Sequence, residues 1–208
     1  MKEEKYSNLV FQSLSHDLKT PIAVIKSHME ALNDKMISNK EFFRVLETQI
    51  NTLEFKVHSL LYINKLDYLT DKENYQNSTI DIKPIIENSI LKFKYIRPDI
   101  IYKTNIVDNT IFRGTYDAWE TIIDNMFNNF IRYAQTEVKI TVKNKEVILY
   151  NDGPSIDESI LNSGFSPYKK GVNGLFGLGL STVSRVLNML GYEISVKNVK
   201  NGVRFQIK

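Results

Sequence analysis

The sequence contains no cysteine, which excludes a disulfide framework, a thiolate zinc site and a thiol nucleophile. It also has no long apolar stretch: runs such as 60–63 (LLYI) are short, and none approaches the roughly 18 apolar residues of a spanning helix. The N-terminus has no signal-peptide pattern. The net charge of +3 is too small to argue for binding to nucleic acid or to a membrane surface. We therefore expect a soluble chain of cytoplasmic character.

The rest of the composition is that of an ordinary globular protein, with 42% hydrophobic and 25% charged residues. Its 208 residues are enough for two modest domains. The texture of the sequence changes around residues 70–78 (TDKENYQNS), a polar stretch without an aliphatic residue that is typical of a linker. We predict a helical domain over 1–69, a linker over 70–78 and a mixed domain over 79–208.

The first domain carries two apolar series at steps of three and four, which predict two helices separated by a polar loop at 33–40. The series consist of Phe11, Leu14, Leu18, Ile22, Ile25, Met29 and Leu32, then Phe43, Leu46, Ile50, Leu53, Val57 and Leu60. One antiparallel hairpin cannot cover its own apolar stripe, so a four-helix bundle in a homodimer is the economical solution. The periodicity alone is also typical of a plain coiled-coil spacer.

The second domain alternates short β-rich runs with helical ones. Strands are predicted over 80–82, 100–104, 138–142, 147–150, 193–196 and 203–207, and helices over 84–94, 118–133 and 180–190. Asp117 followed by Glu120 indicates a capping box at the start of the middle helix. Asn201-Gly202 indicates a hairpin between the last two strands. We therefore predict an α+β protein of two domains: a helical hairpin, then an α/β sandwich of one sheet and one helical layer.

The most distinctive segment of the first helix is 15–21, SHDLKTP. His16 falls between the seam positions Leu14 and Leu18, so its ring should point away from the bundle core. Imidazole supplies a nitrogen nucleophile at neutral pH, and the carboxylate of Asp17 can orient or take up the other ring proton. Thr20 lies one turn further on the same face, where its hydroxyl can position a water. The alternative is an inert surface histidine.

Asn125 and Asn129 are four residues apart on the predicted middle helix, so both amides lie on one face. Amide oxygens suit a hard cation such as Mg²⁺ that is shared with substrate phosphates. Arg132 offers a planar fork of donors to an anion. An amphipathic helix with solvated asparagines is the alternative.

Asn151 and Gly153 directly follow a predicted strand, where Gly-Pro lets the backbone turn sharply and approach a flat ring. Asn151 can accept a hydrogen bond from an adenine amino group and donate one to a ring nitrogen. Further on, the glycine-rich run 171–180 (GVNGLFGLGL) leads into a helix, whose first amides can cradle phosphate. The basic stretch 165–170 before it has the character of a lid. A simple turn and an ordinary loop are the alternatives.

Taken together, these segments resemble a known family. The stretch SLSHDLKTPIAVIKSHMEAL resembles the H-box of the sensor histidine kinases of two-component systems, and the three later clusters resemble their N, G1, F and G2 boxes in the family's order. The resemblance covers residues 7–208. It implies a HisKA-type dimerisation and phosphotransfer domain followed by a Bergerat-type ATP-binding domain.

The resemblance also implies a role for each matching residue. His16 would be the phospho-acceptor, Asp17 its acid/base partner and Thr20 a residue of the phosphatase reaction. The nucleotide site would comprise Asn125 and Asn129 on Mg²⁺, Arg132 and Tyr133 on the nucleotide, Asn151 and Gly153 on adenine, and Gly177, Leu178, Gly179 and Leu180 on the phosphates.

The implied activity is ATP-dependent autophosphorylation of His16, then transfer to an aspartate of a response regulator and dephosphorylation of that regulator. ATP and Mg²⁺ are the implied cofactors. The implied partners are the receiver domain of a response regulator and a second copy of the chain, without nucleic acid. The chain would be a cytoplasmic fragment of a protein in the bacterial cell membrane, with the sensor region and membrane spans outside it.

Three positions depart from the family pattern: Asn151 replaces the usual aspartate, Ser155 a glycine and Phe130 a small residue. The neutral Asn151 should weaken adenine binding by about 1 kcal/mol, and Phe130 should narrow the adenine pocket. Two other classes of function stay open. One is a non-catalytic dimeric scaffold, favoured only by the altered G1 box. The other is an ATPase of the chaperone or mismatch-repair type, which lacks a helix like that of His16.

Overall fold

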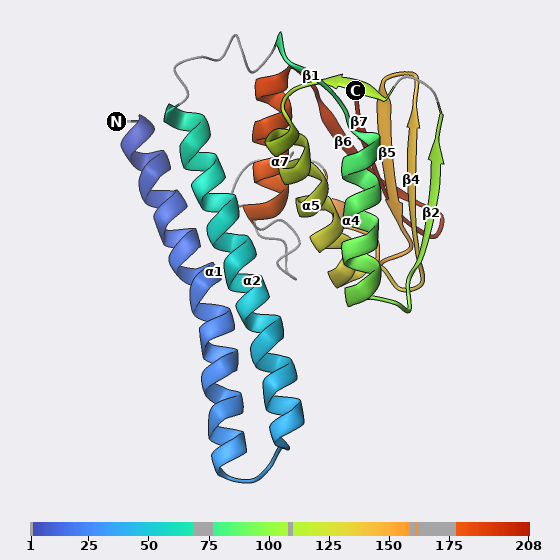
Figure 1. Ribbon diagram of the computed structural model, residues 1–208. Helices are drawn as coiled ribbons and strands as arrows, with labels where there is room; N and C mark the ends of the chain where they lie inside the picture. Colours follow the sequence, from blue (N-terminus) through green and yellow to red (C-terminus); the bar gives the residue numbers. More distant parts are fainter. Residues whose placement is uncertain (1, 69–76, 108–109, 159–160, 162–177) are drawn as a thin grey trace. The chain divides into compact units, whose positions relative to one another are not determined.

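The computed structural model describes residues 2–68, 77–107, 110–158, 161 and 178–208 (Figure 1). The chain divides into two compact units, Met1–Tyr68 and Leu69–Lys208. No helix within the described ranges combines the length and the apolarity needed to cross a lipid bilayer.

The first unit is a hairpin of two long helices, α1 (Lys2–Asn33) and α2 (Asn39–Tyr68), as the apolar periodicity predicts. The α1 helix ends in a tight turn, in which the amide of Met36 donates to the carbonyl of Ala31 (2.8 Å) and Lys35 adopts a left-handed φ of 56°. The hydroxyl of Ser38 accepts from the amide of Glu41 (3.2 Å) and so caps the start of α2.

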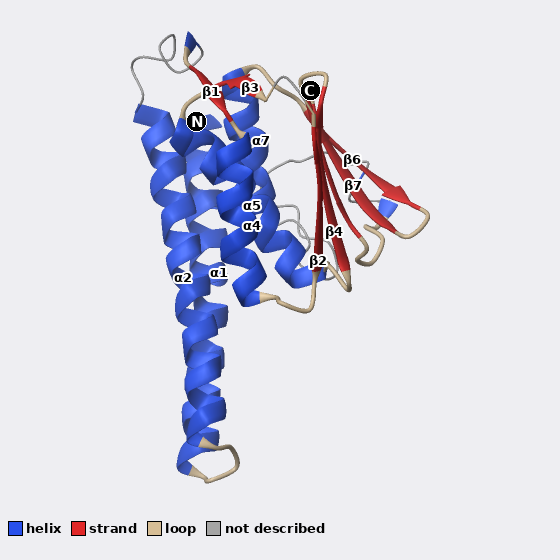
Figure 2. Cartoon of the chain, turned by 45° about the vertical axis from the view of Figure 1, so that its right-hand side comes forward, coloured by secondary structure: helices blue, strands red, loops and turns tan. Residues whose placement is uncertain are grey.

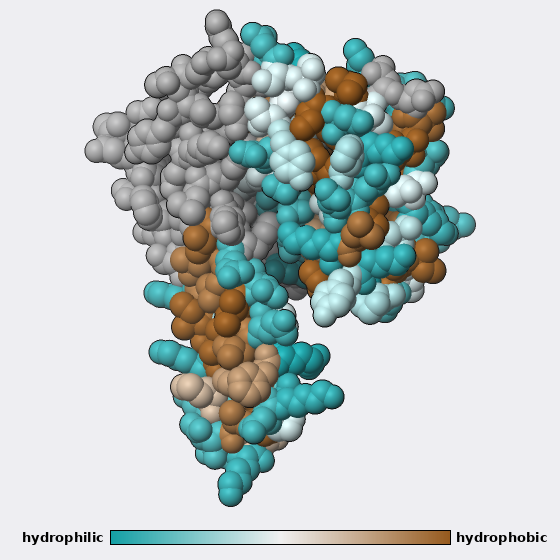
Figure 3. All heavy atoms as spheres, in the orientation of Figure 1, coloured by the Kyte–Doolittle hydropathy of each residue, from teal (hydrophilic) through white to brown (hydrophobic). Residues whose placement is uncertain are grey.

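The hairpin carries two kinds of apolar position. Residues such as Ile25 and Leu46 are half-buried. A second set recurs every seven residues and is largely exposed: Ile22, Met29, Met36, Phe43, Ile50 and Val57. Figure 3 shows hydrophobic side chains gathered along the coloured part of the hairpin of α1 and α2, called the stalk below. The hairpin therefore leaves an apolar stripe uncovered.

The second unit is built on a five-stranded sheet with the order β2-β4-β5-β7-β6. Its strands are β2 (Ile101–Ile106), β4 (Glu137–Lys143), β5 (Glu146–Asn151), β6 (Ile194–Val199) and β7 (Gly202–Ile207). The β2 and β4 strands pair in parallel, and all other pairs are antiparallel. A separate two-stranded sheet joins β1 (Thr79–Asp81) to β3 (Ile111–Arg113).

Three helices, α4 (Lys83–Ile96), α5 (Tyr116–Tyr133) and α7 (Leu178–Leu190), cover one face of the large sheet (Figure 2). The α5 helix lies between the other two and contacts both. The strands β4, β5 and β7 alternate between buried and more exposed positions, as expected for a sheet with one covered face. The core between the layers includes Trp119, Ile122, Phe127, Ile140, Leu149 and Phe205. The predicted sandwich of one sheet and one helical layer is confirmed.

Two local expectations need correction. The N-cap of α5 is Thr115, whose extended backbone (φ −95°, ψ 166°) and hydroxyl, accepting from the amide of Ala118 at 3.4 Å, open the helix. Asp117 lies inside the first turn and is not the cap. The strand β3 was not predicted, because its three residues are too few to show an alternating pattern.

Two tight turns close the hairpins of the sheet. Asn144 and Lys145, with φ of 53° and 61°, join β4 to β5 in the left-handed conformation that matches strand twist. Gly202, with φ of 143°, starts β7 in the hairpin predicted at 201–202. A β-carbon at Gly202 would collide with the backbone carbonyl of Asn151, so only glycine allows the sheet to close there.

Candidate functional site

A pocket of about 310 Å³ opens between α5, the end of β5, the start of α7 and β7. Its lining residues are Asn129, Tyr133, Asn151, Pro154, Ile156, Leu180, Val203 and Phe205. Most of this wall is apolar, and a few polar groups interrupt it. An apolar lining with a few polar groups is typical of sites that hold a small organic molecule.

The α5 helix brings Asn125 and Asn129 to one face, as their spacing predicts. The Nδ2 of Asn125 donates to the carbonyl of Thr121 (2.7 Å), which turns Oδ1 away from its own helix. Within the described part, that oxygen is buried without a hydrogen-bond partner, and a β-carbon on Gly179 would lie 3.0 Å from it. A buried oxygen left unpaired costs about 1–3 kcal/mol, which a cation or donor at the start of α7 would recover.

Asn129 lies one turn further along α5 and lines the pocket itself. Its Nδ2 is also buried and has no partner among the described residues. The neighbouring Asn128 differs, because its Nδ2 donates to the carbonyl of Asp124 (2.8 Å) on its own helix. Among the described residues, the buried side-chain atoms without a partner thus belong to the two asparagines of the predicted face.

The end of β5 supplies the opposite wall. Asn151 is buried, and its Oδ1 accepts a hydrogen bond from the backbone amide of Gly153 (2.9 Å). A β-carbon at Gly153 would collide with the backbone carbonyl of Tyr133, and it would also lie 2.6 Å from Oδ1 of Asn151. Glycine therefore lets the loop after β5 approach the end of α5, which brings Asn151 and Tyr133 to one pocket.

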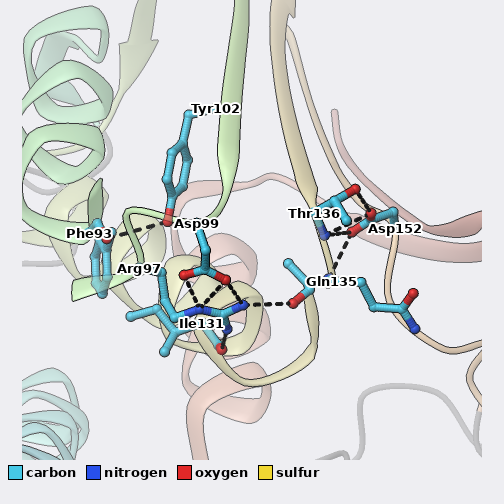
Figure 4. A network of polar contacts seen from close by, with 9 residues as sticks. Phe93, Arg97, Asp99, Tyr102, Ile131, Gln135, Thr136 and Asp152 are labelled. Atoms are coloured by element: carbon cyan, nitrogen blue, oxygen red, sulfur yellow. Dashed lines mark hydrogen bonds and ion pairs between the residues drawn. The ribbon is translucent and has the colours of Figure 1, made fainter. Parts of the chain in front are cut away.

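The carboxylate of Asp152 holds this approach in place (Figure 4). It accepts from the amides of Gln135 (2.9 Å) and Thr136 (2.9 Å) and from the hydroxyl of Thr136. Partial burial raises the pKa of Asp152, but the Thr136 hydroxyl and the surrounding amides lower it more, from 3.8 to about 2. The group is therefore ionised at neutral pH and binds the α5–β4 turn to the end of β5.

The C-terminal end of α5 is fixed by a second charged group (Figure 4). The guanidinium of Arg97 donates to the last-turn carbonyls of Ile131 (2.5 Å) and Ala134 (3.4 Å). Asp99 pairs with the same guanidinium at 2.6 Å. A cation at a helix C-terminus is favourable because it interacts with the free carbonyls and the helix dipole. Arg97 thus helps to hold the end of α5 that carries Asn129 and Tyr133.

The α7 helix closes the pocket with its first turn. Leu180 is buried and lines the pocket, and Gly179 lies against Asn125. Leu178 is the first residue of α7, so the amide-bearing start of this helix lies beside Asn125. Gly177 and the rest of the glycine-rich run 171–176 lie outside the described residues.

Other predicted residues are not all brought together. Arg132 is exposed, with its guanidinium 6.0 Å from the ring centre of Tyr133, and it does not belong to the pocket lining. Phe130 does not line the pocket, although its ring lies next to Phe205, which does. Phe130 is buried in the core, where its ring packs edge-on against Phe127 at a centroid distance of 5.7 Å. Ser155 is exposed and lines a shallow basin on the other side of Pro154.

Several lining residues escaped the sequence reasoning. The apolar wall formed by Ile156, Val203 and Phe205 draws on two distant segments, and only the alternation of β7 indicated that its residues face inward. Asn198 holds that wall: its amide accepts from the backbone amide of Ile156 (2.8 Å) and donates to its carbonyl (2.7 Å). No local pattern could reveal this contact, because the partners lie 42 residues apart.

The predicted acceptor segment lies on α1. His16 and Asp17 are part of this helix, but their side chains lie outside the described part. Thr20 is exposed one turn later. In the part of the chain that the structure describes, no group of three or more His, Cys, Asp or Glu is placed to hold a metal ion.

Known protein families match both the helical hairpin and the unit that contains the pocket. Residues 7–69 match the model of the His Kinase A (phospho-acceptor) domain. Residues 114–208 match the model of the histidine kinase-, DNA gyrase B- and HSP90-like ATPase. The chain belongs to the sensor histidine kinases. The ATPase family of its second unit is one that binds ATP.

Individual relatives agree with this assignment. The sensor histidine kinase CssS of Bacillus subtilis is 32% identical over 214 residues, which cover 100% of this kinase core and 47% of that protein. The sensor protein kinase WalK of Staphylococcus epidermidis is 26% identical over 67% of the core and 23% of that protein. The core thus spans less than half the length of these relatives.

Solved structures show the same fold. The histidine kinase AdeS of Acinetobacter baumannii is similar with a TM-score of 0.64 and 22% identity, over 92% of this core and 95% of that chain. The histidine kinase ThkA, solved in complex with the response regulator protein TrrA, gives a TM-score of 0.68 at 18% identity, over 100% of this core and 63% of that chain.

We expect Gly153→Ala to deform the pocket, because the new β-carbon collides with the carbonyl of Tyr133. Overpacking of this kind costs about 1–3 kcal/mol of unfolding free energy. Urea unfolding followed by the fluorescence of the buried Trp119, the single tryptophan of the chain, should show this loss, and titration with an ATP analogue should show weakened binding. The exposed Ser155→Ala is the control. Unchanged stability and affinity in Gly153→Ala would contradict the close approach.

Proposed function

We propose that this chain transfers the terminal phosphate of ATP to His16 and then to an aspartate of a response regulator, in two-component signalling. One observation supports the proposal above all. Asn125 and Asn129 lie on one face of α5, and each has a buried amide atom without a hydrogen-bond partner among the described residues. Asn129 lines the pocket, and the same chain carries SHDLKTP on a helix. The ThkA structure in complex with a response regulator supports the same class of partner.

The nucleotide is proposed to bind with its base in the pocket and its phosphates toward the start of α7. The apolar surfaces of Ile156, Leu180 and Phe205 suit the faces of a flat ring, and Asn151 offers an edge contact. The backbone amides of Leu178 and Gly179 at the start of α7 favour phosphate, with the helix dipole. In our proposal Gly177, Leu178 and Leu180 belong to the same phosphate cradle, and Tyr133 and Arg132 to the nucleotide site.

A magnesium ion fits the donor set of α5. The unpaired Oδ1 of Asn125 and the amide of Asn129 lie on one face, beside the start of α7, and neutral oxygens suit an ion that also binds phosphates. We propose Asn129 as the main ligand and Asn125 as the second. When bound, the ion would neutralise charge on the phosphates.

In the proposed transfer step, His16 is the one protein group that forms a covalent bond. A nitrogen of the His16 imidazole forms a bond to the γ-phosphorus, while the bond from that phosphorus to the bridging oxygen breaks and its electron pair leaves with ADP. Asp17 is proposed to hold or take up the proton on the other ring nitrogen. Positioning and charge neutralisation supply most of the rate in such transfers.

We further propose that two copies pair through the stalk. Ile22, Met29, Ile50 and Val57 are each more than 40% exposed, although they recur at the heptad spacing of a helix interface. A second hairpin that covers this stripe would complete a four-helix bundle. The exposed stripe is the feature that supports a homodimer over a monomer.

His16→Ala should abolish labelling of the protein from ATP that carries a radioactive γ-phosphate, since it removes the only proposed acceptor. Nucleotide affinity should stay unchanged, because the pocket lies in the other unit. His28→Ala is the control: its Nδ1 contacts the carbonyl of Val24 (2.8 Å) on the same helix. Labelling that survives in His16→Ala would refute the acceptor assignment.

Asn129→Ala should lower magnesium-dependent labelling at least about tenfold, since a lost charge-assisted contact is worth roughly 1.5–3 kcal/mol. Asn128→Ala provides a matched control on the adjacent position, whose amide is satisfied within α5. The measurement is the rate of labelling of each variant over a range of magnesium concentrations. Equal losses in both variants would show that Asn129 acts only through helix stability.

The phosphatase reaction is proposed to depend on Thr20, whose side chain is exposed one turn beyond His16. Thr20→Ala should leave His16 labelling intact and slow the loss of phosphate from a phosphorylated receiver domain. The control is Thr48→Ala on α2, whose hydroxyl donates to the carbonyl of Arg44 (2.8 Å). If both variants release phosphate from the receiver at the wild-type rate, Thr20 has no such role.

A further inference from the structure

The orientation of the Asn151 amide is fixed by its neighbour. The backbone amide of Gly153 is only a donor, and it lies 2.9 Å from the Asn151 side chain. The atom that faces it must therefore be Oδ1, and the other end of the group is the Nδ2 donor. Asn151 is 4% exposed and lines the pocket, so this donor belongs to the pocket wall.

Asn129 brings a second amide nitrogen to the pocket. The Nδ2 of Asn129 is buried without a partner in the described part of the chain. Most of the other lining residues, Pro154, Ile156, Leu180, Val203 and Phe205, have no polar side-chain atom, and the hydroxyl of Tyr133 can either donate or accept. The amide nitrogens of Asn151 and Asn129 are therefore donors that a ligand with hydrogen-bond acceptors can pair.

This polarity bears on which purine the pocket admits. The six-position of adenine carries an amino group, a donor, whereas the same position of guanine carries the oxygen O6, an acceptor. The Nδ2 of Asn151 can donate to O6, or to the acceptor nitrogen next to the amino group of adenine. A carboxylate in its place would offer acceptors alone, which favours the amino group and repels O6.

We propose that Asn151 determines base selectivity and lets this pocket accept 6-oxo purine nucleotides, such as GTP, beside ATP. The inference rests on the nucleotide site of the proposed function and adds its substrate class. Because a mismatch leaves a buried polar atom unpaired, it should change the ratio of the two affinities by roughly 5- to 150-fold.

The test is a titration of the whole chain with the magnesium complexes of ATP, GTP and inosine triphosphate. Inosine shares the 6-oxo group of guanine but lacks its 2-amino group, so it isolates the contact at the six-position. The wild type should bind GTP and inosine triphosphate within about tenfold of ATP. Asn151→Asp should lower the affinity of both 6-oxo nucleotides relative to ATP by about tenfold or more.

Asn128→Asp is the matched control, because it adds the same charge to α5 outside the pocket lining, and it should leave the ratios unchanged. Trp119 fluorescence verifies that each variant is folded. A wild type that rejects both 6-oxo nucleotides by more than a hundredfold would overturn the proposal, as would ratios that Asn151→Asp leaves unaltered. ATP binding in those cases would leave the proposed kinase function standing. Failure of the wild type to bind any nucleotide would overturn both.

Discussion

The pocket depends on one ion, the carboxylate of Asp152. It accepts from the amides of Gln135 and Thr136 and from the Thr136 hydroxyl, and so joins the turn after α5 to the loop after β5. Its pKa of about 2 means that this junction is charged and intact at neutral pH. Because the junction is fixed, the carbonyl of Tyr133 can lie against Gly153, and the two walls of the pocket meet.

Around this junction the structure leaves specific polar atoms unsatisfied. The oxygen of Asn125 and the Nδ2 of Asn129 are buried without partners among the described residues, although folding normally pairs such atoms. The apolar wall that Asn198 holds through Ile156 completes the enclosure. A site with these properties carries a cost in the free protein that a ligand of matching polarity removes, which is the usual condition of a preorganised binding site.

The sequence predicted the secondary structure of the described parts well where patterns were long. The heptad steps of the hairpin and the four-residue spacing of Asn125 and Asn129 are periodic signals, and the structure follows both. Short or competing signals misled. Asp117 resembled a cap, but Thr115 two residues earlier has the extended backbone that a cap needs. Phe130 was expected to narrow the pocket, but it lies in the core and is not part of the lining. The depth of a side chain in the core cannot be inferred from one sequence position.

By itself, the sequence determined the two-domain α+β plan, predicted the acceptor segment around His16, and singled out Asn129 and Asn151, which line the pocket. These features reside in local spacing, which a helix or a strand end converts directly into a shared face. Only the tertiary structure decided which amide atoms lack a partner among the described residues, which end of Asn151 faces Gly153, and how Asp152, Thr136 and Asn198 hold the walls. The contacts of Asp152 with Thr136 and of Asn198 with Ile156 join residues 16 and 42 positions apart, and no local pattern encodes a pairing that packing and desolvation select.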